Sequence, residues 1–188
     1  MNVGKPPGPA SPGRDPGREP SVPQKPPGPL SHVAKGADGR ARARMVDVGP
    51  KQITDRSALA RARVVFPPGL LAPLLAGGGP KGPIEEVARV AGILAAKRTA
   101  ELIPMCHPLG LDHVQLDLEA EGDALVILCR ASCRGRTGIE MEALTGAAIA
   151  ALTVIDMAKA LTPELRIEGV ELLEKSGGRR GHWRSPRA

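Results

Sequence analysis

Asp156 and Lys159 lie three residues apart near the end of an apolar stretch, a spacing that places a carboxylate and an ammonium group side by side on a helix. Such a pair can accept and donate protons, so it is a candidate acid–base couple. Glu142, Thr145 and Thr153 fall close to the line of Asp156 at 3.6 residues per turn. The line is either a functional site or the solvent-exposed edge of a core helix, and the pattern alone supports both interpretations.

The element that must position this line is a helix predicted over residues 137–161 and ended by Pro163. No charged residue occurs between Ala143 and Ile155, so most of the helix should be buried. At a rise of about 1.5 Å per residue, Glu142 and Asp156 are roughly 21 Å apart on it. A small substrate cannot contact both in one subunit. A site that uses both must therefore join two subunits.

A second candidate is the loop of residues 104–109, which contains Cys106 and His107 between Pro104 and Pro108. A lone loop histidine is more often structural than catalytic, but two prolines stiffen this loop and favour a functional role. Zinc is not expected, because the spacing of the cysteines and histidines fits no zinc knuckle. The residues considered for zinc are Cys106, His107, His113, Cys129 and Cys133.

Three lysines complete the candidate chemistry. Lys81 follows three glycines, Lys97 lies near the end of a predicted helix, and Lys175 precedes Ser176-Gly177-Gly178. Each has an ordinary explanation, namely a solvent loop, a favourable interaction with the helix dipole and a frayed tail. Taken together with the histidine and the Asp–Lys pair, they predict an anionic, polyphosphate substrate that needs acid–base chemistry.

Composition excludes several classes of partner. Residues 1–44 hold eight Lys or Arg against three acids, whereas the remainder holds eighteen against seventeen, so the net charge of +6 belongs mostly to the N-terminal segment. Phe66 and Trp183 are the only aromatic residues, which argues against an RNA-binding sheet. Nucleic acid is therefore not an expected partner.

We expect three regions: a Pro/Gly-rich, basic and disordered extension (1–44), a single catalytic domain (45–178) and a basic, flexible tail (179–188). Three cysteines and no secretion signal or membrane-spanning run predict a reduced, cytoplasmic protein without a membrane partner.

The order of elements in the central region predicts an α+β fold. A strand over 63–66, a helix over 84–102, a hairpin of strands 111–121 and 125–130, the helix over 137–161 and a strand over 166–174 follow one another. Residues 45–48 are expected to open the ordered part, and a short helix is expected over 69–76. The series is that of a ferredoxin-like βαββαβ fold, an antiparallel sheet with helices packed on one face.

Several blocks of the sequence resemble the signature blocks of the cyclic pyranopterin monophosphate synthase family, the C protein of molybdenum cofactor biosynthesis. The blocks are Met45-Val46-Asp47-Val48, Ala91-Gly92-Ile93 with Ala95-Ala96-Lys97-Arg98-Thr99, Leu102-Ile103-Pro104-Met105-Cys106-His107-Pro108-Leu109, Thr137-Gly138-Ile139-Glu140-Met141-Glu142-Ala143-Leu144, Asp156-Met157-Ala158-Lys159-Ala160 and Lys175-Ser176-Gly177-Gly178. One departure is Pro83, which stands where the family usually has an acid after Lys-Gly.

The resemblance implies a lyase that rearranges (8S)-3′,8-cyclo-7,8-dihydroguanosine 5′-triphosphate to cyclic pyranopterin monophosphate and releases pyrophosphate. It implies a hexamer built as a trimer of dimers, with active sites at the dimer interface. Asp156 is implied as the catalytic carboxylate and Lys159 as its partner. The implied substrate-binding residues are Met105, Cys106, His107, Met141, Glu142, Lys81, Lys97 and Lys175.

No cofactor is expected to be required, although Mg²⁺ on the substrate phosphates is compatible with this chemistry. A second interpretation is a non-catalytic ferredoxin-like module that binds a nucleotide as a regulatory or assembly subunit. The Asp156–Lys159 pair separates the two, because a binding module does not need it.

Overall fold

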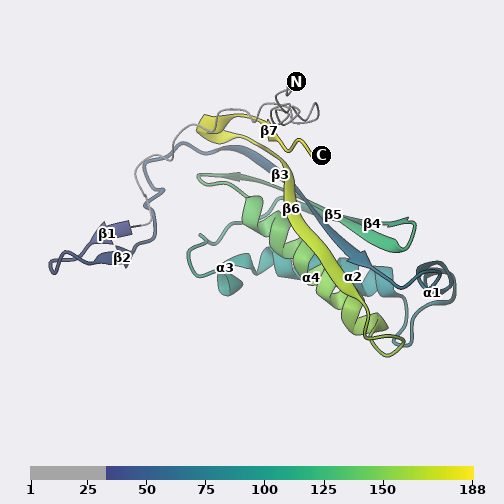
Figure 1. Cartoon of the computed structure of the whole chain (residues 1–188). Helices are drawn as coiled ribbons and strands as arrows, with labels where there is room; N and C mark the ends of the chain where they lie inside the picture. The colour runs from purple at the N-terminus through teal and green to yellow at the C-terminus, as the bar shows by residue number, and fades with distance from the viewer. Residues whose placement is uncertain (1–32) are drawn as a thin grey trace, which may run out of the picture. The chain divides into compact units, whose positions relative to one another are not determined.

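The computed structural model describes residues 33–188 (Figure 1). Most of the extension expected to be disordered therefore lies outside the described residues. By contacts, the chain divides between Ala43 and Arg44 into two units, and each is described by itself.

The described part of the first unit is a small antiparallel hairpin of β1 (Val33–Lys35) and β2 (Ala41–Ala43). Asp38 closes its turn, because its carboxylate accepts hydrogen bonds from the backbone N–H of Arg40 and the guanidinium of Arg42. This hairpin is the part of the N-terminal extension that the structure describes.

The second unit contains a five-stranded sheet in the order β4-β5-β3-β6-β7, with every neighbouring pair antiparallel (Figure 1). The strands are β3 (Thr54–Val65), β4 (His113–Glu121), β5 (Ala124–Gly135), β6 (Arg166–Ser176) and β7 (Trp183–Arg184). The helices are α1 (Leu71–Gly77), α2 (Ile84–Lys97), α3 (Thr99–Leu102), α4 (Glu140–Ala158) and the 3₁₀ turn η1 (Gly178–Arg180). The succession β3-α2-β4-β5-α4-β6 confirms the predicted ferredoxin-like arrangement.

The core lies between the sheet and the helices α2 and α4. Buried residues alternate along β3, where Ala58, Ala60 and Ala62 face the helices and are at most 2% exposed. These small side chains let α4 approach the sheet closely. Gly92 of α2 and Gly146 of α4 likewise let these two helices approach each other closely. A Cβ at Gly92 would lie only 2.8 Å from the carbonyl oxygen of Gly146.

The helix α4 is the core helix that its sequence predicts. It is long and apolar enough to cross a membrane by length and composition, but 56% of it is buried inside the fold, as in the core helix of a soluble protein. Glu140 and Glu142 lie in its first turn, where the positive end of the helix dipole favours them.

Four boundaries differ from the sequence expectations. β3 begins at Thr54 rather than at Arg63, because its alternating alanines and arginines pair along their whole length with β5. The helix expected over 84–102 breaks at Arg98, where φ is −109° and ψ is 16°. The helix expected over 137–161 begins at Glu140 and ends at Ala158. The C-terminal segment expected to be flexible contributes β7, which pairs with Glu174 and Lys175 of β6.

Candidate active site

A cluster of three charged residues lies at the C-terminal end of α4, and we call Lys81, Asp156 and Lys159 the C-end cluster. Lys159 Nζ lies 2.8 Å from Asp156 Oδ1, as expected for positions i and i+3. Lys81 Nζ donates to the other oxygen, Oδ2, at 2.7 Å. Lys81 reaches this position from the loop before α2, where Gly79 and Gly82 exchange backbone hydrogen bonds. The structure thus brings three of the predicted site residues together.

The two lysines govern the ionisation of Asp156. Hydrogen bonds from Lys159 first, and then from Lys81, lower the pKa of Asp156 to about 2. The carboxyl is therefore ionised at neutral pH and cannot act as a proton donor. Its side chain is 53% exposed, so solvent and salt reach this cluster.

A second cluster lies at the other end of α4, and we call Arg56, Cys106, Glu140, Glu142 and Lys175 the N-end cluster. Lys175 Nζ donates to Glu140 Oε1 at 2.6 Å across 35 residues of sequence. Burial acts to raise the pKa of Glu140, but the hydrogen bond and charge of Lys175, with a smaller contribution from Arg56, lower it overall. The pair is half-buried, which strengthens the attraction between its charges.

Two glycines shape the chain beyond Lys175. Gly177 and Gly178 have φ values of 98° and 69°, which residues with a side chain rarely adopt. A Cβ at Gly177 would also collide with the backbone carbonyl of Asp55, so this position requires glycine for both reasons, and Gly178 lies against the guanidinium of Arg56. The loop that follows Lys175 therefore packs against a cation of the site.

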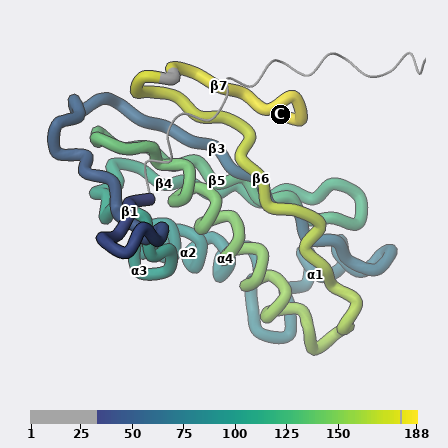
Figure 2. Tube along the Cα trace, turned by 60° about the vertical axis from the view of Figure 1, so that its left-hand side comes forward, coloured from purple at the N-terminus to yellow at the C-terminus, as the bar shows by residue number. Residues whose placement is uncertain are grey.

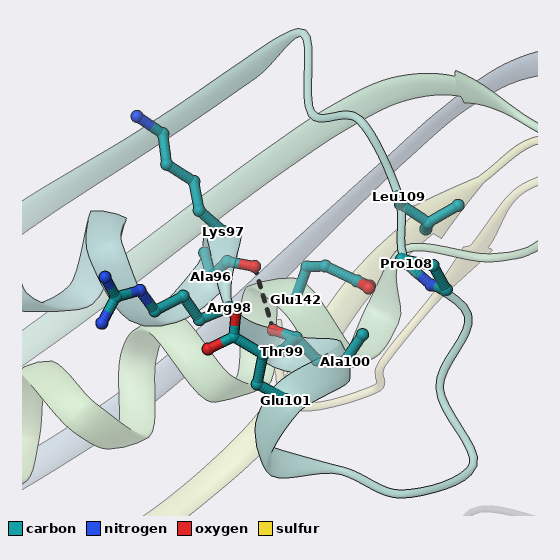
Figure 3. Close-up of a pocket in the computed structure, with 9 residues that line it drawn as sticks. All are labelled: Ala96, Lys97, Arg98, Thr99, Ala100, Glu101, Pro108, Leu109 and Glu142. Atoms are coloured by element: carbon teal, nitrogen blue, oxygen red, sulfur yellow. Dashed lines mark hydrogen bonds between the residues drawn. The ribbon is translucent and has the colours of Figure 1, made fainter.

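Glu142 lies in a cavity of about 110 Å³ beside the break between α2 and α3 (Figure 3). It is 4% exposed, and burial followed by the charge of Glu140 raises its pKa. Pro108 and Leu109 line the opposite side. Figure 3 shows the Lys97 side chain directed away from Glu142, so Lys97 lines this cavity without approaching the carboxylate.

The loop that carries Met105, Cys106 and His107 lies beside the N-end cluster. Burial, and then the charge of Glu142, raises the pKa of Cys106, so its sulfur is a thiol rather than a reactive thiolate. Burial also raises the pKa of Cys133, and that of Cys129 to about 12. His107 Nε2 donates to the backbone carbonyl of Val46 at 2.8 Å.

The two clusters do not meet within one chain. Figures 1 and 2 show α4 as one continuous helix, and Glu142 and Asp156 are roughly 21 Å apart along it. Glu142 and Thr145 are buried, whereas Asp156 is exposed. The line of polar residues is therefore not a uniform solvent edge.

The sequence reasoning missed two members of the N-end cluster. Arg56 lies in the half of β3 that was not predicted as a strand, and its Nε donates to the carbonyl of Gly135 at 3.3 Å. Glu140 had no assigned role, since its place in the first turn of α4 already had a sufficient explanation. Its partnership with Lys175 depends on contacts between α4 and β6 that carry no local signal.

The profile of the MoaC family matches residues 45–178, which include both clusters. The chain belongs to the MoaC family. The cyclic pyranopterin monophosphate synthase of Chloroflexus aggregans is 53% identical over 156 residues, which cover 82% of this chain and 92% of that protein. The enzyme of the same name from Chloroflexus aurantiacus is 53% identical over 160 residues, covering 84% and 96%.

Membership of the MoaC family confirms the resemblance found in the sequence blocks. It also confirms the prediction of a cyclic pyranopterin monophosphate synthase, a lyase of molybdenum cofactor biosynthesis. Among residues 33–188, no three His, Cys, Asp or Glu side chains lie close enough together to hold a metal ion.

Proposed function

We propose that this chain converts (8S)-3′,8-cyclo-7,8-dihydroguanosine 5′-triphosphate to cyclic pyranopterin monophosphate with release of pyrophosphate. The observation that carries the proposal is the C-end cluster, in which two lysines share one ionised carboxylate. Two ammonium groups within about 3 Å of one anion form a compact cationic site that suits a phosphate chain.

The lysines have two tasks in this reaction. When a hydroxyl of the substrate attacks the α-phosphorus, its proton passes to solvent, which reaches this cluster. The bond from the α-phosphorus to the oxygen shared with the β-phosphate breaks, and pyrophosphate leaves with the bonding electrons. Lys81 and Lys159 neutralise the charge that develops on this leaving group. Either ammonium can also donate a proton, whereas the ionised Asp156 holds both lysines in place.

The N-end cluster suits the purine-derived ring. Glu142 is a buried carboxyl in a cavity, and its raised pKa eases protonation, so this group can donate or accept a hydrogen bond at the ring. Phe66 is 3% exposed in the core, so stacking on its ring does not supply the binding. Met105, Cys106, His107 and Met141 complete this half of the proposed site, with Lys97 and Lys175 as further cations.

Both halves contact one substrate only if a second copy of the chain supplies one of them. The surface of α4 supports such a pairing. An outer stripe of apolar residues follows helical spacing along α4 and runs from one cluster to the other. Each of its residues is either half-buried or exposed. The residues of the stripe are Met141, Leu144, Ala148, Leu152 and Ile155.

An antiparallel pairing of two α4 helices about a two-fold axis fits these features. The midpoint between Glu142 and Asp156 is close to Ala148, a small residue that permits close approach. The acidic first turn of one helix then meets Lys159 and Lys81 of the other, and the two helix dipoles are opposed favourably. Each pair of chains contains two identical composite sites.

The proposed hexamer needs a second kind of contact, because one two-fold interface closes a dimer. A separate apolar stripe on α2 offers such a contact: Val87, Val90 and Leu94 are 39%, 63% and 46% exposed. We propose a trimer of dimers in which the stripe on α4 joins the pair and the stripe on α2 joins pairs to one another.

Two further expectations remain part of this proposal. A Mg²⁺ ion bound by the substrate phosphates would neutralise part of their charge, and no step above depends on it. The chain is proposed to work in the cytoplasm, where its cysteines stay reduced; Cys106, Cys129 and Cys133 form no disulfide.

The deciding experiment measures pyrophosphate release from the 3′,8-cyclised nucleotide by the wild type, by Asp156→Asn and by Asp117→Asn. Asp156→Asn should lower turnover at least ~100-fold, because it removes the charge that holds both lysines. Asp117, on β4 and outside both clusters, is the matched control and should remain active. Full activity of Asp156→Asn would overturn the catalytic assignment.

The same assay tests the regulatory interpretation. Binding of the nucleotide without pyrophosphate release by any variant would favour a non-catalytic module. The membership of the MoaC family and the C-end cluster both support the enzyme.

A further inference from the structure

The segment of residues 45–48 has no role in the site described so far, although it contacts one of its residues. Val46 accepts a hydrogen bond from His107 Nε2 at 2.8 Å, and 61 residues of sequence separate the two. We propose that this segment positions His107 and fixes its proton on Nε2, which leaves Nδ1 as the proton acceptor toward the substrate. The role of Nδ1 rests on the proposed function, whereas the position of the proton does not.

The direction of the hydrogen bond determines the tautomer. A backbone carbonyl can only accept, so Nε2 must carry the hydrogen. In a ring with one proton, Nδ1 then has a free lone pair and can take a proton from the substrate. A histidine without a fixed partner exchanges between both tautomers, so only part of its population has Nδ1 ready to accept.

Further contacts hold the acceptor in place. The Asp47 carboxylate accepts from the backbone N–H of Gly49 at 2.8 Å, and Val48 accepts from the N–H of Lys51 at 3.0 Å. Arg136, just beyond β5, donates to the carbonyl of Lys51 at 3.1 Å. The turn that follows Val46 is thus tied to the loop before α4.

The histidine side of the contact is also held. Pro104 and Pro108 restrict the loop, and the N–H of Cys106 donates to the carbonyl of Ile103 at 3.0 Å. With both partners fixed, the hydrogen bond sets the plane of the ring as well as its proton. A displacement of about 1 Å in such a group costs roughly 100-fold in rate, so the segment matters to turnover without contacting substrate.

The first test is independent of activity. Nitrogen NMR of the full chain labelled at histidine should show His107 with the proton on Nε2 and an unprotonated Nδ1, with its signal assigned by His107→Asn. The exposed His113 serves as the reference and should show both tautomers. A proton on Nδ1 of His107, or the same mixture as in His113, would overturn the proposal.

The second test perturbs the segment rather than the histidine. Asp47→Ala removes the acceptor for Gly49, whereas Asp47→Asn keeps an oxygen in that place. Asp47→Ala should lower kcat about 10- to 100-fold with little change in KM. In the same variant, His107 should show a mixture of both tautomers. Asp47→Asn should recover the wild-type spectrum and most of the turnover.

A charge effect of Asp47 would instead make both variants equally slow, and that result would refute a positioning role. Unchanged kcat and unchanged tautomer in Asp47→Ala would refute it as well. If the wild type releases no pyrophosphate, the proposed function fails, but the NMR result still decides whether residues 45–48 fix the proton of His107.

Discussion

Asp156 shows how strongly a neighbourhood can change the role of a side chain. In the sequence, Asp156 lies beside one lysine, Lys159, on the same helix, and this spacing indicates an acid–base pair. The second lysine, Lys81, comes from a loop 75 residues away and adds to the effect of Lys159, so that the pKa of the carboxyl falls from its ordinary 3.8 to about 2 and the group stays an anion even in moderately acidic solution. The proton donors of the C-end cluster are therefore its two lysines.

This arrangement predicts how Asp156 titrates. Lys159→Met should raise the pKa of Asp156 from about 2 toward its ordinary value, and Lys81→Met should raise it by less, because Lys159 is the larger cause. Carbon NMR of the labelled carboxyl measures both values, and 1 M salt should raise the wild-type pKa because the cluster is exposed.

The lowered pKa of Asp156 also makes the stability of the fold depend on pH. A lowered pKa in the folded state stabilises the fold above the ordinary pKa of 3.8, and this contribution is lost as pH falls through about 2. A pKa of Asp156 that stays at about 2 in both methionine variants would contradict the role given to the lysines.

At the scale of elements, the sequence was sufficient wherever hydrophobic periodicity is local. The helix α4 and the hairpin of β4 and β5 follow from spacing alone, and their order implied the fold. The predicted strand over 63–66 was shorter than β3, because the preceding residues favour helix in isolation. These residues are Ala58, Leu59, Ala60 and Arg61. Pairing with β5 on one side and β6 on the other overrides that preference.

The clusters were harder to predict because they depend on which ends of elements meet. Asp156 with Lys159 was predictable from helical spacing. Arg56 with Gly178 and Val46 with His107 are contacts between segments far apart in the chain, and neither side has a distinctive pattern. Only the three-dimensional structure reveals them.

The contact between α2 and α4 gives a prediction at this scale. Gly92→Ala should destabilise the fold by about 1–3 kcal/mol, despite the better helix propensity of alanine, because its Cβ would lie against the backbone of Gly146. Denaturant unfolding measures the change. Gly110→Ala is the matched control, since nothing lies within 4 Å of its Cβ position, and an equal loss in both variants would contradict the packing argument.

At the scale of the whole molecule, the proposed pairing predicts complementation between two inactive variants. Asp156→Asn damages the C-end cluster and Glu142→Gln the N-end cluster. Mixed pairs contain one site with both defects and one intact site, so co-expression should restore activity to about one quarter of the sites. Pyrophosphate release measures it.

A matched mixture provides the control for complementation. Asp156→Asn with Lys159→Met places both defects in the C-end cluster, so every composite site keeps one of them and activity should stay absent. No restoration by the first mixture would show that each chain forms its site alone, and restoration by the control mixture would contradict the placing of Asp156 and Lys159 in one cluster.

The two apolar stripes predict different outcomes when charged. Leu152→Glu should separate the paired chains and abolish turnover, because it places a carboxylate within the apolar stripe on α4. Val90→Glu on α2 should reduce the hexamer to active dimers. Light scattering coupled to size-exclusion chromatography measures the mass, and an active Leu152→Glu monomer would exclude the proposed pairing.

The chain has a single tryptophan and no tyrosine, so its near-ultraviolet emission comes from one position. That position, Trp183, lies on β7 opposite Lys175 and next to His182, which is paired with Glu174. The ring is 42% exposed and lies outside the hydrophobic core. The protein thus carries a built-in optical reporter of the sheet edge beside Lys175, which can follow ligand arrival there in real time without any attached dye.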